Sequence, residues 1–462
     1  MTFTSITFLI FLTVVLVVNY CIPQKWRYLF LLAASYYFYL NWQPIYAVLL
    51  LFTTIITYFG AKIMWNENNI RRRKGICLIG CIIPLGALAL FKYYSFITEN
   101  ISSLLRTLHI GIVLPEMELM LPIGISFYTF TAVGYLLDIY NRKYHPENNF
   151  GIFCLFIAFF AQITSGPIPR GEQLIPQLKR PDNLEYDNVM RGFRIMLWGF
   201  FMKLCVADRL SVYVDTIFGN ISSHNGGSIL LAMFLYTIQI YCDFAGYSFI
   251  AIGASRMLGI KLMDNFRRPY LARNIKDFWG RWHISLSTWF RDYVYIPLGG
   301  NRVSKSRHKF NLMTTFLISG LWHGAAWNFI LWGGLHGVGQ IAEKSCSRLR
   351  FTPPQFVKIC LTFLFVSICW MFFRLSQVDN VFIGIKKIIF DFGLPFIDAV
   401  LVYGTLTLFI VIIKDVIDEY FPNIKLLNSE NFWISNISTG IFASIIILFG
   451  SFGSSSFIYF QF

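Results

Sequence analysis

Long uncharged apolar runs recur along this chain, and they restrict what it can fold into. A helix needs roughly 20 apolar residues to cross about 30 Å of hydrocarbon, and most of these runs reach that length. The chain is 56% hydrophobic and 14% charged, whereas soluble domains average about 25% charged residues. The pattern predicts an all-α, polytopic integral membrane protein with about 10–12 transmembrane helices plus re-entrant segments. The runs are Phe3–Ile22, Tyr28–Ala61, Gly75–Phe91, Leu119–Leu137, Asn148–Pro169, Thr216–Cys242, Phe310–Ala342, Phe392–Ile413 (interrupted by Asp398) and Asn431–Phe462.

The run Tyr28–Ala61 is too long for one crossing. It contains Asn41-Trp-Gln-Pro44, so we expect two helices. The first basic residue, Lys25, follows the first apolar run, which favours a retained first helix over a cleaved signal peptide. No repeat or low-complexity linker divides the sequence, and we expect a single domain over residues 1–462.

Basic residues cluster in particular loops of this chain, whose net charge is +15. Lys25, the stretch 71–74 and the pair Arg142-Lys143 mark three short basic loops, with less basic loops between them. Cytoplasmic loops are enriched in Lys and Arg. The distribution therefore predicts that these loops are cytoplasmic and that the N-terminus lies outside.

The most basic segment extends from Lys261 to Lys309 and holds 11 Lys or Arg against 3 Asp. A cytoplasmic anchoring loop explains this charge. A docking surface for an anionic donor, such as the phosphates of CoA or an acidic carrier protein, explains it too, and the two interpretations are compatible. Nucleic acid is an unlikely partner, because the charge lies in a membrane-bound loop without a recognition motif.

Two histidines, His323 and His336, lie inside the uncharged run Phe310–Ala342. An ionisable group in a membrane-length apolar segment indicates a functional site. His336 lies 13 positions after His323, which on one unbroken helix corresponds to about 220° of rotation. The two can therefore converge only if Gly333-Gly334 breaks or bends the helix. His336 is then either part of the site or a hydrogen-bonded structural histidine.

A third histidine, His283, lies among aromatic residues and hydroxyls in the segment Asp277–Asn301. A membrane-surface amphipathic helix would explain the Trp, Tyr and Arg content of this segment, but it explains His283 less well. A metal centre formed by the three histidines is conceivable. No carboxylate or thiolate flanks them at ligand spacing, so we expect no metal site.

An ordered set of motifs resembles the membrane-bound O-acyltransferase (MBOAT) family. The resemblance extends over about residues 121–337, which form the motif-bearing core, and it is strongest to the bacterial branch that includes alginate O-acetyltransferase membrane subunits. Peptidoglycan O-acetyltransferases and the D-alanyl transferases of teichoic acid belong to the same branch. The motifs are Ser165–Arg170 leading into Pro176–Leu178, Tyr241–Ser248, Asn265–Tyr270, Phe278–Gly300 and Trp322-His-Gly324.

The resemblance implies particular roles for the histidines. His323 matches the essential histidine of the family, and His283 matches a second polar position. An imidazole near neutral pKa can take the proton of a hydroxyl as its oxygen attacks a thioester carbonyl. We therefore expect His323 to be the base, and His283 to orient the substrate or stabilise the developing oxyanion.

Further residues are candidates for contact with the channel or the substrate. Asp243 is either a buried structural or channel residue or a carboxylate at a helix end. Arg170 and Gln177 lie in a Pro- and Gly-rich segment that resembles a re-entrant loop, whose backbone must line a cavity or be buried in protein. The set is His336, Asp243, Arg281, Ser285, Trp322, Arg170 and Gln177.

The resemblance also implies a function. We expect transfer of an acyl group, with acetyl from acetyl-CoA as the leading candidate, across the inner membrane of a bacterium to a hydroxyl of a cell-envelope or exported polysaccharide. The acceptor is reached directly or through an extracytoplasmic partner, and no cofactor is held. Two alternatives are D-alanyl-type transfer from a carrier protein, and a polysaccharide exporter or lipid flippase without covalent chemistry.

Overall fold

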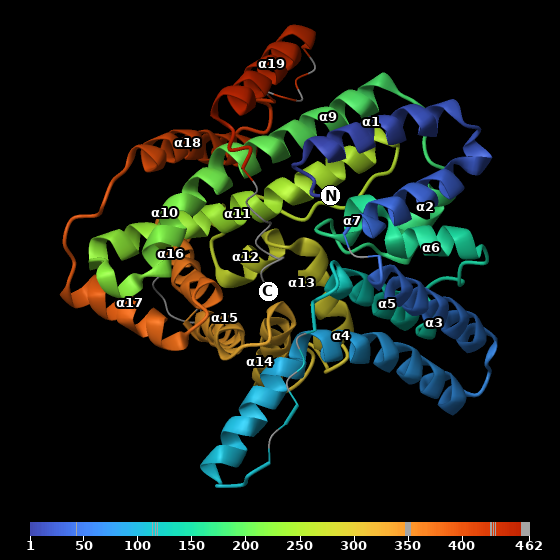
Figure 1. The fold of residues 1–462 in the computed structure, drawn as a ribbon, viewed down its shortest axis with the longest axis horizontal. Coiled ribbons are helices and arrows are strands. Elements are labelled where there is room, and N and C mark those ends of the chain that lie inside the picture. Colours follow the sequence, from blue (N-terminus) through green and yellow to red (C-terminus); the bar gives the residue numbers. More distant parts are fainter. Residues whose placement is uncertain are drawn as a thin grey trace. The chain divides into compact units, whose positions relative to one another are not determined.

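A computed structural model describes residues 1–42, 44–112, 114–115, 117, 119–346, 353–425, 427, 429 and 431–453. Within these ranges the regular structure is helical, without strands (Figure 1), which confirms the predicted all-α membrane fold. Five described helices are long and apolar enough to cross a bilayer. They are α3 (Tyr46–Asn66), α4 (Ile70–Thr107), α11 (Gly226–Met257), α16 (Gln355–Arg374) and α19 (Phe432–Phe449).

The chain divides into two compact units. The first comprises Met1–Val189 and Ser255–Met263, and the second comprises Met190–Ala254 and Asp264–Phe462. The single domain expected for residues 1–462 stays a prediction. Besides α3 and α4, the first unit holds α1 (Ile6–Cys21), α2 (Gln24–Leu40), α5 (Ile125–Tyr140), α6 (Phe150–Ala158), α7 (Phe160–Ile163) and α8 (Gly171–Lys179).

Two predictions about the first unit have different outcomes. The break at Asn41–Pro44 is confirmed, because α2 ends at Leu40 and α3 begins at Tyr46. The predicted run Asn148–Pro169 is not one spanning helix, since the short helices α6 and α7 are separated at Phe159. The non-helical residues 164–168 that follow are buried in protein, as backbone at membrane depth requires.

The helix α4 is longer than the uncharged run that predicted it. It begins with the basic residues 71–74 and continues to Thr107. Its N-cap, Asn69, accepts hydrogen bonds from the backbone N–H groups of Arg71 and Arg72. This cap satisfies donors at the helix start, which explains why the helix forms before the apolar residues begin.

The second unit contains the three histidines of the predicted site. Helix α9 begins at Tyr186, before the division between the units. It ends at Phe200. The elements that follow α9 are η1 (Phe201–Ala207), α10 (Asp208–Gly219), η2 (Ile221–Ser223), α11, η3 (Pro269–Leu271), α12 (Ile275–Arg281), α13 (Ile284–Phe290), η4 (Arg291–Tyr295), α14 (Lys305–His323), α15 (Trp327–Cys346), α16, α17 (Val378–Phe390), α18 (Ala399–Tyr420) and α19.

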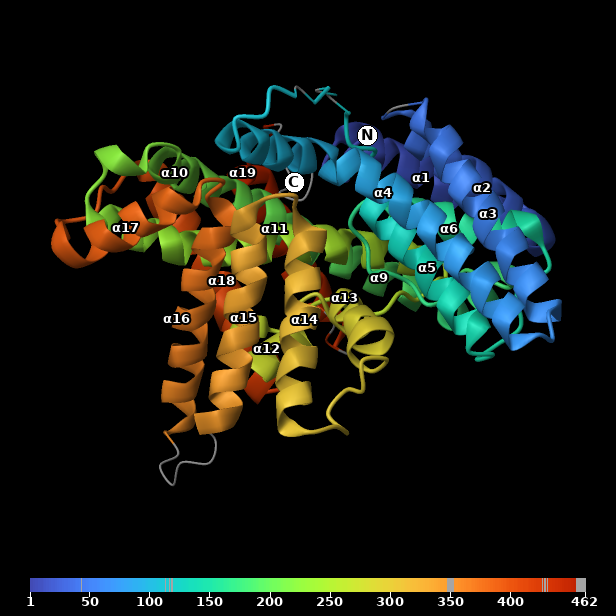
Figure 2. The ribbon, with the colours of Figure 1, turned by 90° about the horizontal axis from the view of Figure 1, so that it is seen from below.

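The run Phe310–Ala342 forms two helices rather than one. Helices α14 and α15 pack side by side, with α16 beside α15 (Figure 2), and Gly324–Ala326 joins the first pair. A Cβ atom on Gly324 would lie 2.1 Å from the buried ring of Phe329, so any other residue in this turn would have to displace that ring. The chain therefore breaks at Gly324–Ala326 and not at Gly333-Gly334, where the sequence placed the break or bend needed to bring His323 and His336 together; α15 continues through that pair.

Other predicted boundaries also change. The run Thr216–Cys242 is divided between α10 and α11, which are separated by a turn near His224. Helix α16 was missed because Lys358 interrupts its apolar pattern. Helix α19 accounts for the start of the last run, whereas residues 454–462 lie outside the described part of the chain.

Candidate active site

His323 is the last residue of α14 and lies immediately before the turn into α15. Its side chain is buried, and its ring contacts three aromatic rings. The ring centroids of Trp322 and Trp332 are each 4.9 Å away, and that of Phe373 on α16 is 5.3 Å away. Three neighbouring helices thus enclose the imidazole in an apolar environment.

His283 lies between α12 and α13, which together replace the single amphipathic helix considered for this segment. Its backbone has φ 43°, in the left-handed region that non-glycine residues rarely adopt. Such strain often marks functional positions. The ring is fully buried, and its Nδ1 lies 3.2 Å from Oδ1 of Asn265.

Imidazole and indole rings alternate through the site. The ring of His283 is 6.3 Å from that of Trp322, which also contacts His323. On the other side, Trp332 contacts both His323 and His336, with centroids 4.9 and 5.0 Å away. The structure therefore brings the three predicted histidines and Trp322 into one cluster, which we call the histidine–indole cluster. Its rings are His283, Trp322, His323, Trp332, His336 and Trp279.

His336 is fully buried in α15. The Nε1–H of Trp279 donates to its Nδ1 over 3.3 Å. A neutral imidazole that accepts at Nδ1 carries its hydrogen on Nε2. The break at Gly324 lets His336 join the cluster, so no break or bend is needed at Gly333-Gly334, where the sequence predicted one.

A cavity of about 1220 Å³ adjoins the cluster. Trp279 and Ser319 are in its wall, and Ser319 lies one helical turn before His323 on the same face of α14. Apolar side chains such as Phe290 and Phe316 cover much of the interior. Its basic residues are Arg273, Lys276, Arg291, Lys344 and Lys358, and its acidic residue is Glu343.

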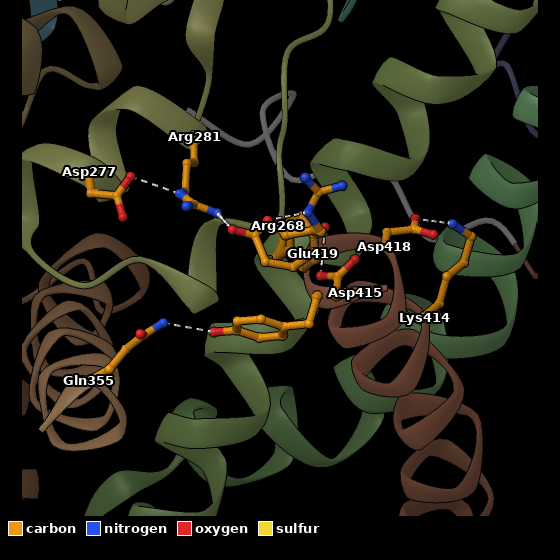
Figure 3. A network of polar contacts seen from close by, with 10 residues as sticks. Arg268, Asp277, Arg281, Gln355, Lys414, Asp415, Asp418 and Glu419 are labelled. Carbon is orange, nitrogen blue, oxygen red and sulfur yellow. Dashed lines mark hydrogen bonds and ion pairs between the residues drawn. The ribbon is translucent and has the colours of Figure 1, made fainter. Parts of the chain in front are cut away.

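Ser285 and Arg281, both predicted as possible substrate contacts, are held by protein groups. Ser285 is buried and bonds Asn265 through its Oγ, 2.9 Å away. The guanidinium of Arg281 lies between Asp277, at 2.8 Å, and Glu419 of α18, at 3.0 Å (Figure 3). These bonds order the helix end that precedes His283.

Asp243 lies in a separate buried charge cluster. Its carboxylate pairs with Lys203 of η1, which also pairs with Asp208 at 2.7 Å. All three side chains are at most 5% exposed. Burial in a membrane helix and pairing agree with the structural or channel alternative for Asp243, rather than with a solvated helix end.

Arg170 and Gln177 belong to the first unit. Arg170 precedes α8, and Gln177 lies within it. The amide of Gln177 accepts from the backbone N–H of Lys261 over 2.8 Å and donates to the carbonyl of the same residue over 3.1 Å. Gln177 therefore anchors the start of the basic segment to α8.

Sequence reasoning missed Asn265, Trp279 and Trp332 as site residues. Asn265 stands in a motif that signalled the family, but its contacts with His283 and Ser285 depend on the tertiary fold. Trp332 lies four positions before His336, about one turn of helix, and this spacing can be read from the sequence. In the described part of the chain, no three His, Cys, Asp or Glu side chains are grouped to hold a metal ion.

The fold and the site together define a multi-pass helical membrane protein with buried histidines beside a basic-rimmed cavity. The profile of the MBOAT, membrane-bound O-acyltransferase family matches residues 119–378. This chain belongs to that family, and it is an O-acyltransferase.

Several bacterial proteins are similar to this chain. The probable alginate O-acetylase of Pseudomonas putida is 36% identical over 397 residues, which are 85% of this chain and 81% of that protein. The peptidoglycan O-acetyltransferase of Helicobacter pylori is 34% identical, over 78% of this chain and 73% of its own length. The teichoic acid D-alanyltransferase of Bacillus subtilis is 32% identical over 57% of this chain and 70% of its own length.

Proposed function

We propose that this chain moves an acetyl group from acetyl-CoA, on the cytoplasmic side of a bacterial inner membrane, to a hydroxyl of a cell-envelope or exported polysaccharide. The acetyl group reaches the glycan directly or through an extracytoplasmic partner. The names of the alginate and peptidoglycan relatives support acetyl transfer to a polysaccharide. These relatives match 78–85% of this chain, whereas the D-alanyltransferase of Bacillus subtilis matches 57%.

The cavity beside the histidine–indole cluster carries the proposal. Its five Lys or Arg side chains against one Glu suit the phosphates of CoA. Its apolar interior suits the extended pantetheine arm, and its wall reaches Ser319, one turn from His323. A thioester bound with its phosphates at the basic residues would thus direct its carbonyl carbon towards the histidines.

In the proposed reaction, His323 removes the proton of the acceptor hydroxyl as its oxygen attacks the thioester carbonyl. A carbon–oxygen bond forms, the carbon–sulfur bond breaks, and His323 returns the proton to the leaving thiolate. The products are the O-acetyl ester and free CoA thiol, so no oxidant or reductant is needed. His283 orients the hydroxyl or stabilises the oxyanion, and the buried rings exclude water that would hydrolyse the thioester.

Reconstituted vesicles can test the donor and the base together. With labelled acetyl-CoA on the side of the basic segment, we expect ester-linked label on an added polysaccharide or purified partner. With an acylated carrier protein as the only donor, we expect no transfer to the acceptor. Efficient transfer from the carrier protein alone would overturn the choice of CoA as donor.

The variant His323→Ala should lower the rate about 10²-fold to 10⁴-fold, because a positioned base contributes about that much. The matched control is His145→Ala, which removes an exposed histidine of the first unit and should retain activity. A folded His323→Ala protein that acetylates at the wild-type rate would overturn the assignment of the base.

A further inference from the structure

The side chain of Asn265 connects His283 to the start of α13. Asn265 is fully buried, and its Oδ1 lies 3.2 Å from the backbone nitrogen of Ser285, 2.9 Å from Ser285 Oγ and 3.2 Å from His283 Nδ1. A backbone N–H can only donate a hydrogen bond. The atom that faces Ser285 must therefore be the amide oxygen, and the orientation of the Asn265 amide is fixed.

The same oxygen determines the tautomer of His283. Because Oδ1 can only accept, Nδ1 of His283 must carry a hydrogen, and a neutral imidazole then has its lone pair on Nε2. The rings of Phe244 and Trp322 lie 4.6 and 6.3 Å from the imidazole. These apolar surroundings and complete burial favour the neutral ring over imidazolium.

Asn265 and its neighbours also hold the backbone of His283. The N–H of Ile284 donates to the carbonyl of Asn265 over 2.9 Å, and the N–H of Arg267 donates to the carbonyl of Arg281 over 2.9 Å. These two bonds bracket His283, whose φ of 43° is in the strained left-handed region. One loop thus fixes the position of the ring and its protonated nitrogen.

We propose that Asn265 is a positioning residue that keeps the hydrogen of His283 on Nδ1, so that Nε2 accepts the hydrogen bond of the acceptor hydroxyl. This assignment rests on the proposed function, and it decides between the two roles considered for His283. The neutral ring has no N–H at Nε2 to donate to an oxyanion, so His283 orients the hydroxyl for deprotonation by His323.

Two substitutions separate this role from a merely structural one. Asn265→Asp keeps an acceptor at the same place and adds a negative charge that favours imidazolium. The acid limb of the kcat profile should therefore move about 1–3 pH units higher, with KM for the donor unchanged. Asn265→Leu removes the acceptor, and kcat should fall about 10-fold to 100-fold at every pH.

The matched control is Asn311→Leu. Asn311 is also fully buried, and its Nδ2 donates to the carbonyl of Gly300 over 3.1 Å. This variant should lose stability like Asn265→Leu, but its pH profile should match the wild type. If the profile of Asn265→Asp coincides with the wild-type profile, or if Asn311→Leu shifts it equally, the positioning role is overturned.

Nitrogen NMR of histidine-labelled protein gives a readout that needs no activity. The His283 signals, identified by their loss in His283→Gln, should show a protonated Nδ1 and an unprotonated Nε2. The opposite tautomer in the wild-type protein would overturn the proposal. If the tautomer is as expected but His283→Ala retains the wild-type rate, the proposed function of His283 fails instead.

Discussion

At the residue scale, single charges determine how α18 is attached beside the site. Glu419 receives hydrogen bonds from Arg268 over 2.7 Å and from Arg281 over 3.0 Å (Figure 3). Arg281 also bonds Asp277 of α12. Helix α18 is therefore linked to both sides of the loop that carries Asn265 and His283.

Removing the charge of Glu419 should weaken this link in a pH-dependent way. Burial alone would raise the pKa of Glu419, but the bonds and charges of Arg268 and Arg281 outweigh it and lower the pKa. Because the pKa of Glu419 is lower in the folded protein than in the unfolded chain, its ionised carboxylate stabilises the fold at pH values above the unfolded pKa of about 4.3. This stabilisation is lost as the pH falls through the folded value.

We expect Glu419→Gln to lower stability by about 1 kcal/mol at neutral pH, and the difference from the wild type to shrink below about pH 4. Thermal unfolding in detergent between pH 3.5 and 8 measures it. As a control, Asp391→Asn disrupts an exposed 3.9 Å pair with Lys387 and should change little. A stability difference that is constant with pH would contradict the prediction.

At the scale of elements, the contact between α14 and α15 depends on glycines. A Cβ atom on Gly320 would lie 2.3 Å from the carbonyl oxygen of Phe329, and one on Gly333 would lie 2.3 Å from that of Phe316. Both clashes are with backbone, which cannot move aside as a flexible side chain can. The absence of these side chains brings the two helices close enough for Trp332 to contact His323.

The variant Gly333→Ala should therefore separate the helices. We expect a loss of about 1–3 kcal/mol in stability and a lower kcat, because Trp332 immediately precedes the substituted residue. Thermal unfolding and the acetylation assay measure these effects. The neighbouring Gly334→Ala is the matched control, since its Cβ would meet only Leu317 Cδ2 at 3.7 Å. Equal effects of the two variants would contradict this account.

At the scale of the whole molecule, the distribution of charge predicts the orientation in the membrane. Cys21 and Cys360 are exposed and would react with thiol reagents, so both are first replaced by Ser. In intact cells, Thr2→Cys should then react with a membrane-impermeant reagent, because the N-terminus is predicted to lie outside. Arg72→Cys should react only with a permeant one, and the reverse result would contradict the predicted orientation.

The sequence predicted the helical membrane class and the break at Asn41–Pro44, both of which the structure confirms. It also singled out His283, His323 and His336, whose rings lie in one cluster, while their roles stay predictions. Its apolar runs did not reveal the turn at Gly324, because glycine and alanine also occur within membrane helices. They did not reveal α16 either, because Lys358 breaks its pattern. Sequence could identify these residue types and spacings, but not the packing that joins them.

The parts of the site that the sequence did not predict depend on contacts between residues that are far apart in the chain. Glu419 reaches Arg281 across 138 positions, and Asn265 reaches His283 across 18. Nothing in the local pattern around Asn265 distinguishes a buried amide from a solvated one in a basic loop. Three-dimensional placement was therefore needed to see that the basic segment folds back to hold a histidine.

The hairpin of α14 and α15 has a consequence for how the protein enters the membrane. Its turn, Gly324–Ala326, carries no Lys, Arg, Asp or Glu, and neither does the rest of the run Phe310–Ala342. The translocon can therefore insert both helices as a pair without moving a charge through hydrocarbon, while Lys309 and Lys344 remain on the side where they were synthesised. Two of the histidines would then reach the apolar layer together, already on adjacent helices.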